Sequence, residues 1–212
     1  LCAAIIKKVH IVLHEQNAYP GLVNRWIGKY ADRICVAFED MHTYFPSNKI
    51  IYTGNPIRLS IDNELSREEA KIELGLDPNK KLVLITGGSL GAKTLNDAML
   101  NALNKIRDAE QVQWLWQCGD RYFENLTTLF KDLPAHVQLV PFINRMQIAM
   151  IASDLICARA GALTLSEIAG YGRASILIPS PNVAEDHQNK NARAVEMSGG
   201  ALVLQDSDAK DH

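Results

Sequence analysis

Short runs of apolar and β-branched residues recur along the chain and are separated by longer polar or amphipathic stretches. Apolar runs of about 4–8 residues are typical of buried strands, whereas apolar residues three or four positions apart are typical of helices. The pattern predicts strands at 9–13, 34–37, 49–52, 82–86, 112–117, 137–140, 155–158, 175–178 and 201–204. From residue 82 onward each gap is long enough for a helix and a crossover, so we expect a parallel sheet covered by helices on both faces.

Turn and capping residues mark where several helices begin and end. We expect the first six residues to be the end of a helix. A second helix is expected to open at 20–23 with Pro20 in its first turn, where a missing N–H costs no helical hydrogen bond. Ser66 and Glu69 have the spacing of a capping box, and Gly75 and Pro78 predict the end of the helix that follows.

Residues 53–65 carry no helix or strand period and include Gly54 and Pro56, which predicts a boundary between two domains. We expect 1–56 to be the last part of one Rossmann-like domain and 57–212 to be a doubly wound α/β domain, truncated at its end. A chain of 212 residues at about 150 per domain agrees with one domain and part of another. The first residue is not Met, so we expect a piece of a longer protein.

Composition and charge narrow the class of protein. With 47% hydrophobic and 22% charged residues, the chain has the composition of a packed globular protein. Its 22 Lys and Arg residues nearly balance 24 Asp and Glu residues, so no overall positive field favours nucleic acid, and we expect no nucleic-acid partner. Cys2, Cys35, Cys118 and Cys157 form no C-x-x-C pair, which indicates reduced, cytosolic thiols and neither a disulfide frame nor a zinc site. No apolar run reaches the ~20 residues of a membrane span.

The most informative segment is a glycine-rich loop between the strand at 82–86 and a helix. Ligands of doubly wound sheets bind at this edge, beyond the carboxyl ends of the strands. Gly87, Gly88 and Gly91 allow a close approach to a phosphate, and the helix start offers free N–H groups. The loop also matches the G-x-S-x-G pattern of α/β-hydrolases, with Ser89 as the nucleophile. Phosphate cradle, structural tight turn and nucleophile elbow all remain open on this motif alone.

A second glycine-containing helix start follows the strand at 155–158. Thr164 and Glu167 are three residues apart and therefore lie on one face of the helix that Gly161 precedes. A hydroxyl with free N–H groups suits a diphosphate, and a carboxylate one turn later suits the two hydroxyls of a ribose. The same residues also satisfy a plain T-x-x-E capping box. Two such helix starts on one sheet favour a nucleotide, because a single cap would not require both.

Two polar segments complete the expected edge. The run 185–191 includes His187 and Gln188, which can bind sugar hydroxyls or can simply be polar residues at a helix start. The segment 14–17 is either a hydrogen-bonding loop or a ligand contact. A metal site is not expected there, because position 18 is Ala18 and the H-E-x-x-H spacing is absent.

Together these segments resemble the MurG family, the peptidoglycan GlcNAc transferases of glycosyltransferase family 28. Five motifs occur in the order found in that family: HEQNAYPG at 14–21, GNPIR at 54–58, GGSLGA at 87–92, GALTLSE at 161–167 and DHQNKNA at 186–192. The similarity covers nearly the whole chain. It implies a GT-B fold, in which two Rossmann-like domains face a cleft and the C-terminal domain binds the nucleotide sugar.

The resemblance also implies which residues bind the donor. Ser89 and Thr164 are expected at the diphosphate and Glu167 at the ribose, with the backbone of Ile143 at the uracil edge and Arg58 near the base. Around the sugar and phosphates, the family pattern further implies Asn17, His187, Gln188 and the backbone of Ala162 and Leu163 at GlcNAc, and Gly87, Gly88, Gly91 and Gly161 as the phosphate loops.

By resemblance, the protein transfers GlcNAc with inversion from UDP-GlcNAc to undecaprenyl-diphospho-MurNAc-pentapeptide, converting lipid I into lipid II. No cofactor and no metal are expected. The implied location is peripheral, on the cytoplasmic face of the bacterial inner membrane. A full family member carries an earlier glycine-rich loop with the histidine proposed as the catalytic base and a membrane-binding patch, so we expect both to lie outside this chain. The alternatives are another UDP-sugar enzyme of GT-B fold, such as a UDP-GlcNAc 2-epimerase, or a donor-binding subunit without activity of its own.

Overall fold

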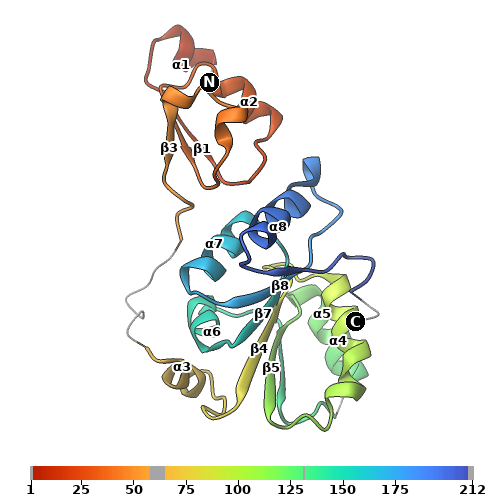
Figure 1. Cartoon of the computed structure of the whole chain (residues 1–212). Helices are drawn as coiled ribbons and strands as arrows, with labels where there is room; N and C mark the ends of the chain where they lie inside the picture. The colour runs from red at the N-terminus through yellow and green to blue at the C-terminus, as the bar shows by residue number, and fades with distance from the viewer. Residues whose placement is uncertain (1, 58–64, 131, 210–212) are drawn as a thin grey trace.

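The computed structural model describes residues 2–57, 65–130 and 132–209, which form two separate parallel sheets (Figure 1). The first sheet has the order β1-β2-β3, and the second has the order β6-β5-β4-β7-β8-β9. Every strand pair in both sheets is parallel. The strands are β1 Val12–Glu15, β2 Arg33–Val36, β3 Ile50–Tyr52, β4 Lys81–Thr86, β5 Val112–Gln117, β6 Val137–Val140, β7 Leu155–Ala158, β8 Ala174–Leu177 and β9 Leu202–Val203.

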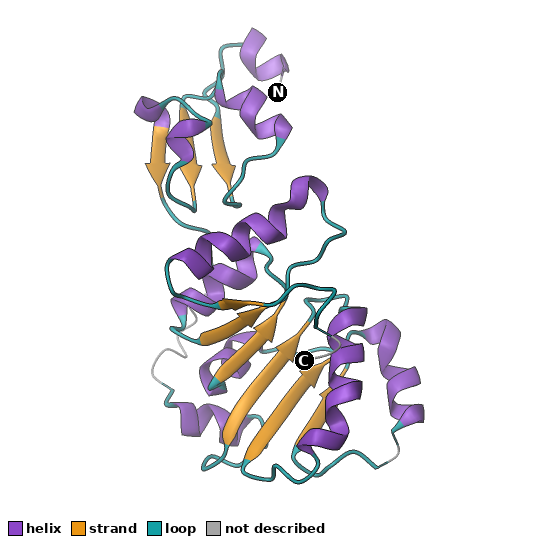
Figure 2. Ribbon diagram, turned by 45° about the vertical axis from the view of Figure 1, so that its right-hand side comes forward, coloured by secondary structure: helices purple, strands orange, loops and turns teal. Residues whose placement is uncertain are grey.

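Helices connect the strands and cover both faces of the six-stranded sheet (Figure 2). The α-helices are α1 Cys2–Ile6, α2 Leu22–Gly28, α3 Arg67–Glu73, α4 Lys93–Ile106, α5 Asp120–Leu129, α6 Met146–Ala152, α7 Ala162–Gly170 and α8 His187–Met197, with short 3-10 turns at η1 Met41–Thr43, η2 Ser47–Lys49 and η4 Ala184–Asp186. Within the described ranges, no helix combines the length and the apolar character needed to cross a membrane.

The order of the larger sheet confirms the predicted doubly wound α/β fold. From β4 the chain moves outward through β5 and β6, then returns to the other side of β4 and moves outward through β7, β8 and β9. Alternate residues of β4 face opposite cores: Leu82 and Leu84 pack with α6 and α7, and Val83 and Ile85 pack with α4 and α5. The direction of winding reverses between β4 and β7, and a ligand site is therefore expected where these two strands end.

Two details near the N-terminus differ from the prediction. The first strand begins at Val12, later than residue 9, because the Ile11 N–H is bonded to the Asp32 carboxylate at 2.7 Å and does not join a strand. Val12 is 67% exposed, so the start of this strand is not buried. The second helix has Gly21 as its N-cap, which places Pro20 before the helix and outside its first turn.

A half-buried carboxylate joins three elements at the amino edge of the larger sheet. Asp154 accepts hydrogen bonds from Arg67 at 2.8 Å, Lys71 at 3.1 Å and Lys81 at 3.2 Å, and from the Leu82 N–H at 2.9 Å. Burial by itself raises the pKa of Asp154, but the Leu82 N–H and the two ammonium groups outweigh it and lower the pKa to about 2. The charged carboxylate therefore fastens α3 to β4 and to the start of β7.

We expect Asp154→Asn to lower the free energy of unfolding by about 2 kcal/mol at neutral pH. The pKa of Asp154 is depressed in the folded state, so its contribution is complete above about pH 4 and is lost as the pH falls toward 2. Urea denaturation between pH 2 and pH 7 measures this dependence. The control is Glu196→Gln, which breaks an exposed ion pair with Arg193 and should change stability by about 0.5 kcal/mol or less. Equal acid sensitivity of Asp154→Asn and the parent chain would contradict the assignment.

Candidate nucleotide-sugar site

A cavity of about 580 Å³ lies at the carboxyl edge of the larger sheet, where the direction of winding reverses. The loops that follow β4, β5, β7 and β8 all contribute to its wall. Its lining residues are Gly87, Gly88, Ser89, Leu90, Gly91, Ala92, Lys93, Thr94, Arg121, Tyr122, Arg159, Gly161, Thr164, Ser180, Asn182, Gln188 and Asp206.

The glycine loop after β4 has little room for side chains. A Cβ atom at Gly91 would lie 1.8 Å from the Cys118 carbonyl oxygen, and Gly91 has a φ of +70°. A Cβ atom at Gly87 would lie 2.3 Å from the Ala92 backbone nitrogen. Both positions therefore require glycine. At Gly91 the backbone of the loop lies against the end of β5, and at Gly87 it lies against the start of α4.

Two helices begin at this cavity without a side-chain cap. The N-cap of α4 is Ala92 and that of α7 is Gly161, and neither has a side-chain hydrogen bond. By contrast, α3 starts away from the cavity with the predicted capping box of Ser66 and Glu69. The first N–H groups of α4 and α7 thus have no internal cap, and helix starts of this kind attract anions.

The alternative of a capping box at α7 is wrong. Gly161 occupies the cap position, and Thr164 lies inside the first turn, so its side chain does not cap the helix. Its Oγ1 lies 3.8 Å from the position that a Cβ at Gly161 would occupy, and both residues line the cavity.

Charged groups at the cavity are partly neutralised by neighbours. Arg159 forms an ion pair with Asp206 and donates to the Ile178 carbonyl at 3.0 Å. The same Asp206 accepts a hydrogen bond from Thr94 at 3.1 Å, which joins the loop after β7 to the start of α4. Arg121 instead lies over the ring of Tyr122, 4.5 Å from its centroid. With Lys93, the wall of the cavity holds three cationic side chains, including Arg121 and Arg159, and one carboxylate, Asp206.

The structure brings seven of the predicted site residues around this one cavity: Gly87, Gly88, Ser89, Gly91, Gly161, Thr164 and Gln188. Ala162, Leu163 and Glu167 belong to the same helix α7 as Thr164 but do not line the cavity. Ile143 lies in the loop between β6 and α6, and His187 is the first residue of α8. Arg58 lies outside the described residues.

Asn17 lies in the loop after β1 of the smaller sheet, and the buried side chain of Asn191 connects it to the larger domain. Asn191 of α8 donates to Asn17 Oδ1 at 3.1 Å and accepts from the Ala18 N–H at 2.8 Å. Glu15, only 1% exposed, accepts from both the backbone and the side chain of Asn17, at 2.9 and 3.2 Å. A second connection joins Asn55 to Ser166 Oγ at 2.9 Å. The loop after β1 is therefore a hydrogen-bonded structure that holds Asn17 beside α8.

Several lining residues were not singled out as candidates from the sequence. Arg121 and Tyr122 follow the strand β5, and Ser180 and Asn182 follow β8. Their position directly after strands of a parallel sheet was the signal that could have identified them. Asp206 lies beyond the last strand, and nothing in its local sequence points to the cavity.

The nucleophile alternative for Ser89 gains no geometric support. A serine nucleophile needs a base within hydrogen-bond reach. In the described ranges, the His14 and His136 side chains are hydrogen-bonded to carbonyl oxygens. His10 lies 3.6 Å from the Asp32 carboxylate, and none of these contacts involves Ser89.

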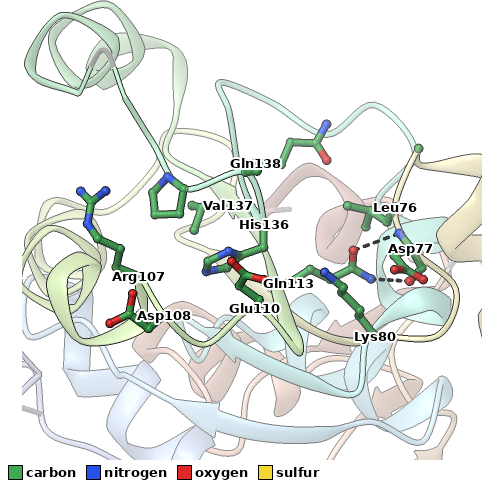
Figure 3. Close-up of a pocket in the computed structure, with 13 residues that line it drawn as sticks. Leu76, Asp77, Lys80, Arg107, Asp108, Glu110, Gln113, His136, Val137 and Gln138 are labelled. Carbon is green, nitrogen blue, oxygen red and sulfur yellow. Dashed lines mark hydrogen bonds between the residues drawn. The ribbon is translucent and has the colours of Figure 1, made fainter.

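A second cavity, of about 710 Å³, lies at the opposite edge of the same sheet (Figure 3). It is formed where β5 and β6 begin, and its wall mixes cations such as Arg107 and Lys80 with the carboxylates of Asp108 and Glu110. Helix α4 ends at this edge, and its Ile106 carbonyl is bonded to His136 at 2.9 Å. Because the C-terminal end of a helix carries partial negative charge, this cavity suits a phosphate less well than the first one.

The doubly wound sheet and the cavity at its switch point define a Rossmann-like α/β domain of the GT-B type. The model of the glycosyltransferase family 28 C-terminal domain matches residues 82–212, and that of the family 28 N-terminal domain matches residues 1–36. The chain belongs to glycosyltransferase family 28.

Individual proteins are similar to the chain over nearly its whole length. A relative from Flavobacterium psychrophilum, named UDP-N-acetylglucosamine--N-acetylmuramyl-(pentapeptide) pyrophosphoryl-undecaprenol N-acetylglucosamine transferase, is 43% identical over 98% of the chain. The equally named protein of Halalkalibacterium halodurans is 43% identical over 97% of it. The crystal structure of Acinetobacter baumannii MurG aligns with 97% of the chain at 33% identity and a TM-score of 0.75. The chain spans 56% of the length of the first relative and 56% of the crystallised MurG chain.

We expect Gly91→Ala to lower the free energy of unfolding by about 3 kcal/mol or more, because the new methyl group meets the Cys118 carbonyl. Gly88→Ala is the matched control in the same loop. Gly88 also has a positive φ, of +80°, but no atom lies within 4 Å of its Cβ position, so only the backbone strain of about 1–2 kcal/mol is expected. Urea denaturation compares the two variants. Equal losses would contradict the packing described for Gly91.

Proposed function

We propose that the whole protein is an inverting glycosyltransferase that moves GlcNAc from UDP-GlcNAc to undecaprenyl-diphospho-MurNAc-pentapeptide. The observation that carries the proposal is the pair of uncapped helix starts, α4 and α7, at one cavity beside the glycine loop. The similarity to relatives with that transferase name supports the choice of donor and acceptor.

The helix starts suit the charge that develops in this reaction. In an inverting transfer, the acceptor oxygen attacks the anomeric carbon while the bond from that carbon to UDP breaks. The electron pair leaves with UDP, and the acceptor hydroxyl gives its proton to a base. We propose that the base lies outside this chain. Preorganised N–H groups at the diphosphate stabilise the departing charge, and the loss of one such donor costs about 2.7–4 kcal/mol.

The individual residues have the roles that the family pattern implies. We propose that Ser89 and Thr164 contact the diphosphate and that Glu167 binds the ribose hydroxyls. The backbone of Ile143 contacts the uracil edge, and Arg58 lies near the base. Asn17, His187, Gln188 and the backbone of Ala162 and Leu163 surround GlcNAc. Support comes from the shared cavity of Ser89, Thr164 and Gln188, and from the Asn191 bond that holds Asn17 beside α8.

The two sheets belong to parts of the chain for which we propose different substrates. We propose that residues 1–56 belong to the acceptor-binding domain and residues 57–212 to the donor-binding domain. We also propose that the protein works at the cytoplasmic face of the inner membrane, because its acceptor is anchored there by an undecaprenyl chain.

The test is release of UDP from UDP-GlcNAc by the whole protein. We expect release that depends on the lipid-linked acceptor. Thr164→Ala should lower turnover by about 100-fold through the loss of a diphosphate contact. Glu167→Ala should mainly raise the KM for UDP-GlcNAc, because the ribose contact is present before and during transfer.

The control variant is Thr127→Ala in α5, whose hydroxyl bonds only to carbonyls of its own helix, at 2.9 and 3.0 Å. It should leave both constants unchanged. Release of UDP without any acceptor would favour a different UDP-sugar enzyme, such as a 2-epimerase. Unchanged kinetics in both site variants would refute the assigned roles.

A further inference from the structure

Gln117 is a buried polar side chain at the end of an otherwise largely apolar strand. It is the last residue of β5 and is only 2% exposed. It does not line the cavity, and the resemblance assigns it no role. A buried carboxamide needs partners for its oxygen and its two N–H groups, and these partners show what it holds in place.

All of its hydrogen bonds go to the edge where the cavity lies. Gln117 Oε1 accepts from the Thr86 hydroxyl at 2.5 Å, and the same hydroxyl oxygen accepts from the Gly88 N–H at 3.2 Å. Gln117 Nε2 donates to the Gly88 carbonyl at 3.0 Å and to the Pro141 carbonyl at 3.4 Å. The side chain thus bonds the glycine loop directly and, through Thr86, a second time.

The bond to the Gly88 carbonyl sets the direction of the next N–H group. The carbonyl of Gly88 and the N–H of Ser89 belong to one peptide unit, and in a trans peptide these two groups point in opposite directions. The Gly88 carbonyl accepts from Gln117 and also from the Gly91 N–H at 2.9 Å, so the Ser89 N–H points away from both donors. Gly88 and Ser89 both line the cavity. In the described ranges, no protein acceptor is bonded to this N–H.

The second N–H of the same carboxamide reaches the loop after β6. Pro141 also accepts from the Gly119 N–H at 3.0 Å and lies two residues before Ile143, the residue expected at the uracil edge. One side chain therefore joins the diphosphate loop to the loop expected to hold the base, and fixes their separation.

We propose that Gln117 is a positioning residue for the nucleotide: it aims the Ser89 N–H at the diphosphate and sets the distance from that group to the base loop. The identity of the ligand in this inference rests on the proposed function. The hydrogen bonds of Gln117 to the two loops do not depend on it. Gln117 does not touch the nucleotide itself.

The same strand supplies a matched control. Gln113 lies four residues earlier in β5, is 4% exposed, and bonds to the backbone of a single loop residue, Asp77 (Figure 3). It accepts from the Asp77 N–H at 3.0 Å and donates to the Asp77 carbonyl at 2.7 Å. Gln113→Met and Gln117→Met therefore remove comparable buried bonds from opposite ends of one strand.

The first measurement needs no ligand. Hydrogen exchange of the Gly91 N–H, which is bonded to the Gly88 carbonyl at 2.9 Å, should become at least ~10-fold faster in Gln117→Met, since the loop loses its anchor. Exchange in Gln113→Met should stay as in the parent chain. Thr86→Val, which removes the hydroxyl between Gly88 and Gln117, should behave like Gln117→Met. Unchanged exchange at Gly91 in both loop variants would overturn the inference, whether or not UDP binds.

The second measurement is calorimetric titration with UDP of the parent chain, Gln117→Met and Gln113→Met. Urea denaturation first establishes that the two variants have the same free energy of unfolding. We expect affinity to fall roughly 10- to 100-fold in Gln117→Met and to be unchanged in Gln113→Met. A parent chain that does not bind UDP would contradict the proposed function, and the exchange result would then decide the positioning role separately. Equal affinity of Gln117→Met and Gln113→Met for UDP would overturn the inference even if the parent chain binds.

Discussion

Helix starts at the carboxyl edge of the larger sheet leave backbone N–H groups that no side chain caps. Each helix that follows a parallel strand delivers its first N–H groups to this edge. In α4 and α7 the cap positions hold Ala92 and Gly161, which have no side-chain acceptor to offer. An anion at this edge would satisfy these donors and meet the positive ends of both helices. The glycine loop and the buried polar groups behind it lie directly beside these donors.

Buried contacts behind the cavity restrict the movement of these N–H donors. Gly91 lies against the Cys118 carbonyl at a distance that excludes any side chain. The same carbonyl accepts from Asn96 at 3.1 Å, and Asn96 in turn accepts from the Trp116 indole at 2.9 Å. This buried chain ties α4 to β5, while Gln117 ties the loop before α4 to the same strand. A rigid edge loses little ordering entropy when a ligand binds, which favours tight and selective binding.

Much of the fold follows from local pattern. Strands from β4 onward were predicted within one or two residues, because buried parallel strands read as apolar runs between helical segments. The start of β1 was misplaced because a distant carboxylate, Asp32, takes the Ile11 N–H, and no local pattern encodes that bond. The glycine loop and the start of α7 were recognisable as helix starts after strands, and both line one cavity.

Other parts of the site depend on contacts between residues far apart in sequence. The bond between Asn17 and Asn191 spans 174 positions, and the ion pair between Arg159 and Asp206 spans 47. Neither pair has a spacing that a local motif can signal. Gln117 reads as one more residue of a buried strand until its three partners are seen together. The choice between a capping box and an open helix start at Thr164 likewise needed the backbone, which places the cap at Gly161.

The most direct test is a crystal structure of the chain with UDP. We expect the diphosphate within hydrogen-bond distance of the Ser89 N–H and of the first turn of α7, with the base toward the loop that contains Ile143. A nucleotide found instead at the opposite edge, among Arg107 and His136, or a diphosphate that contacts neither helix start, would contradict it.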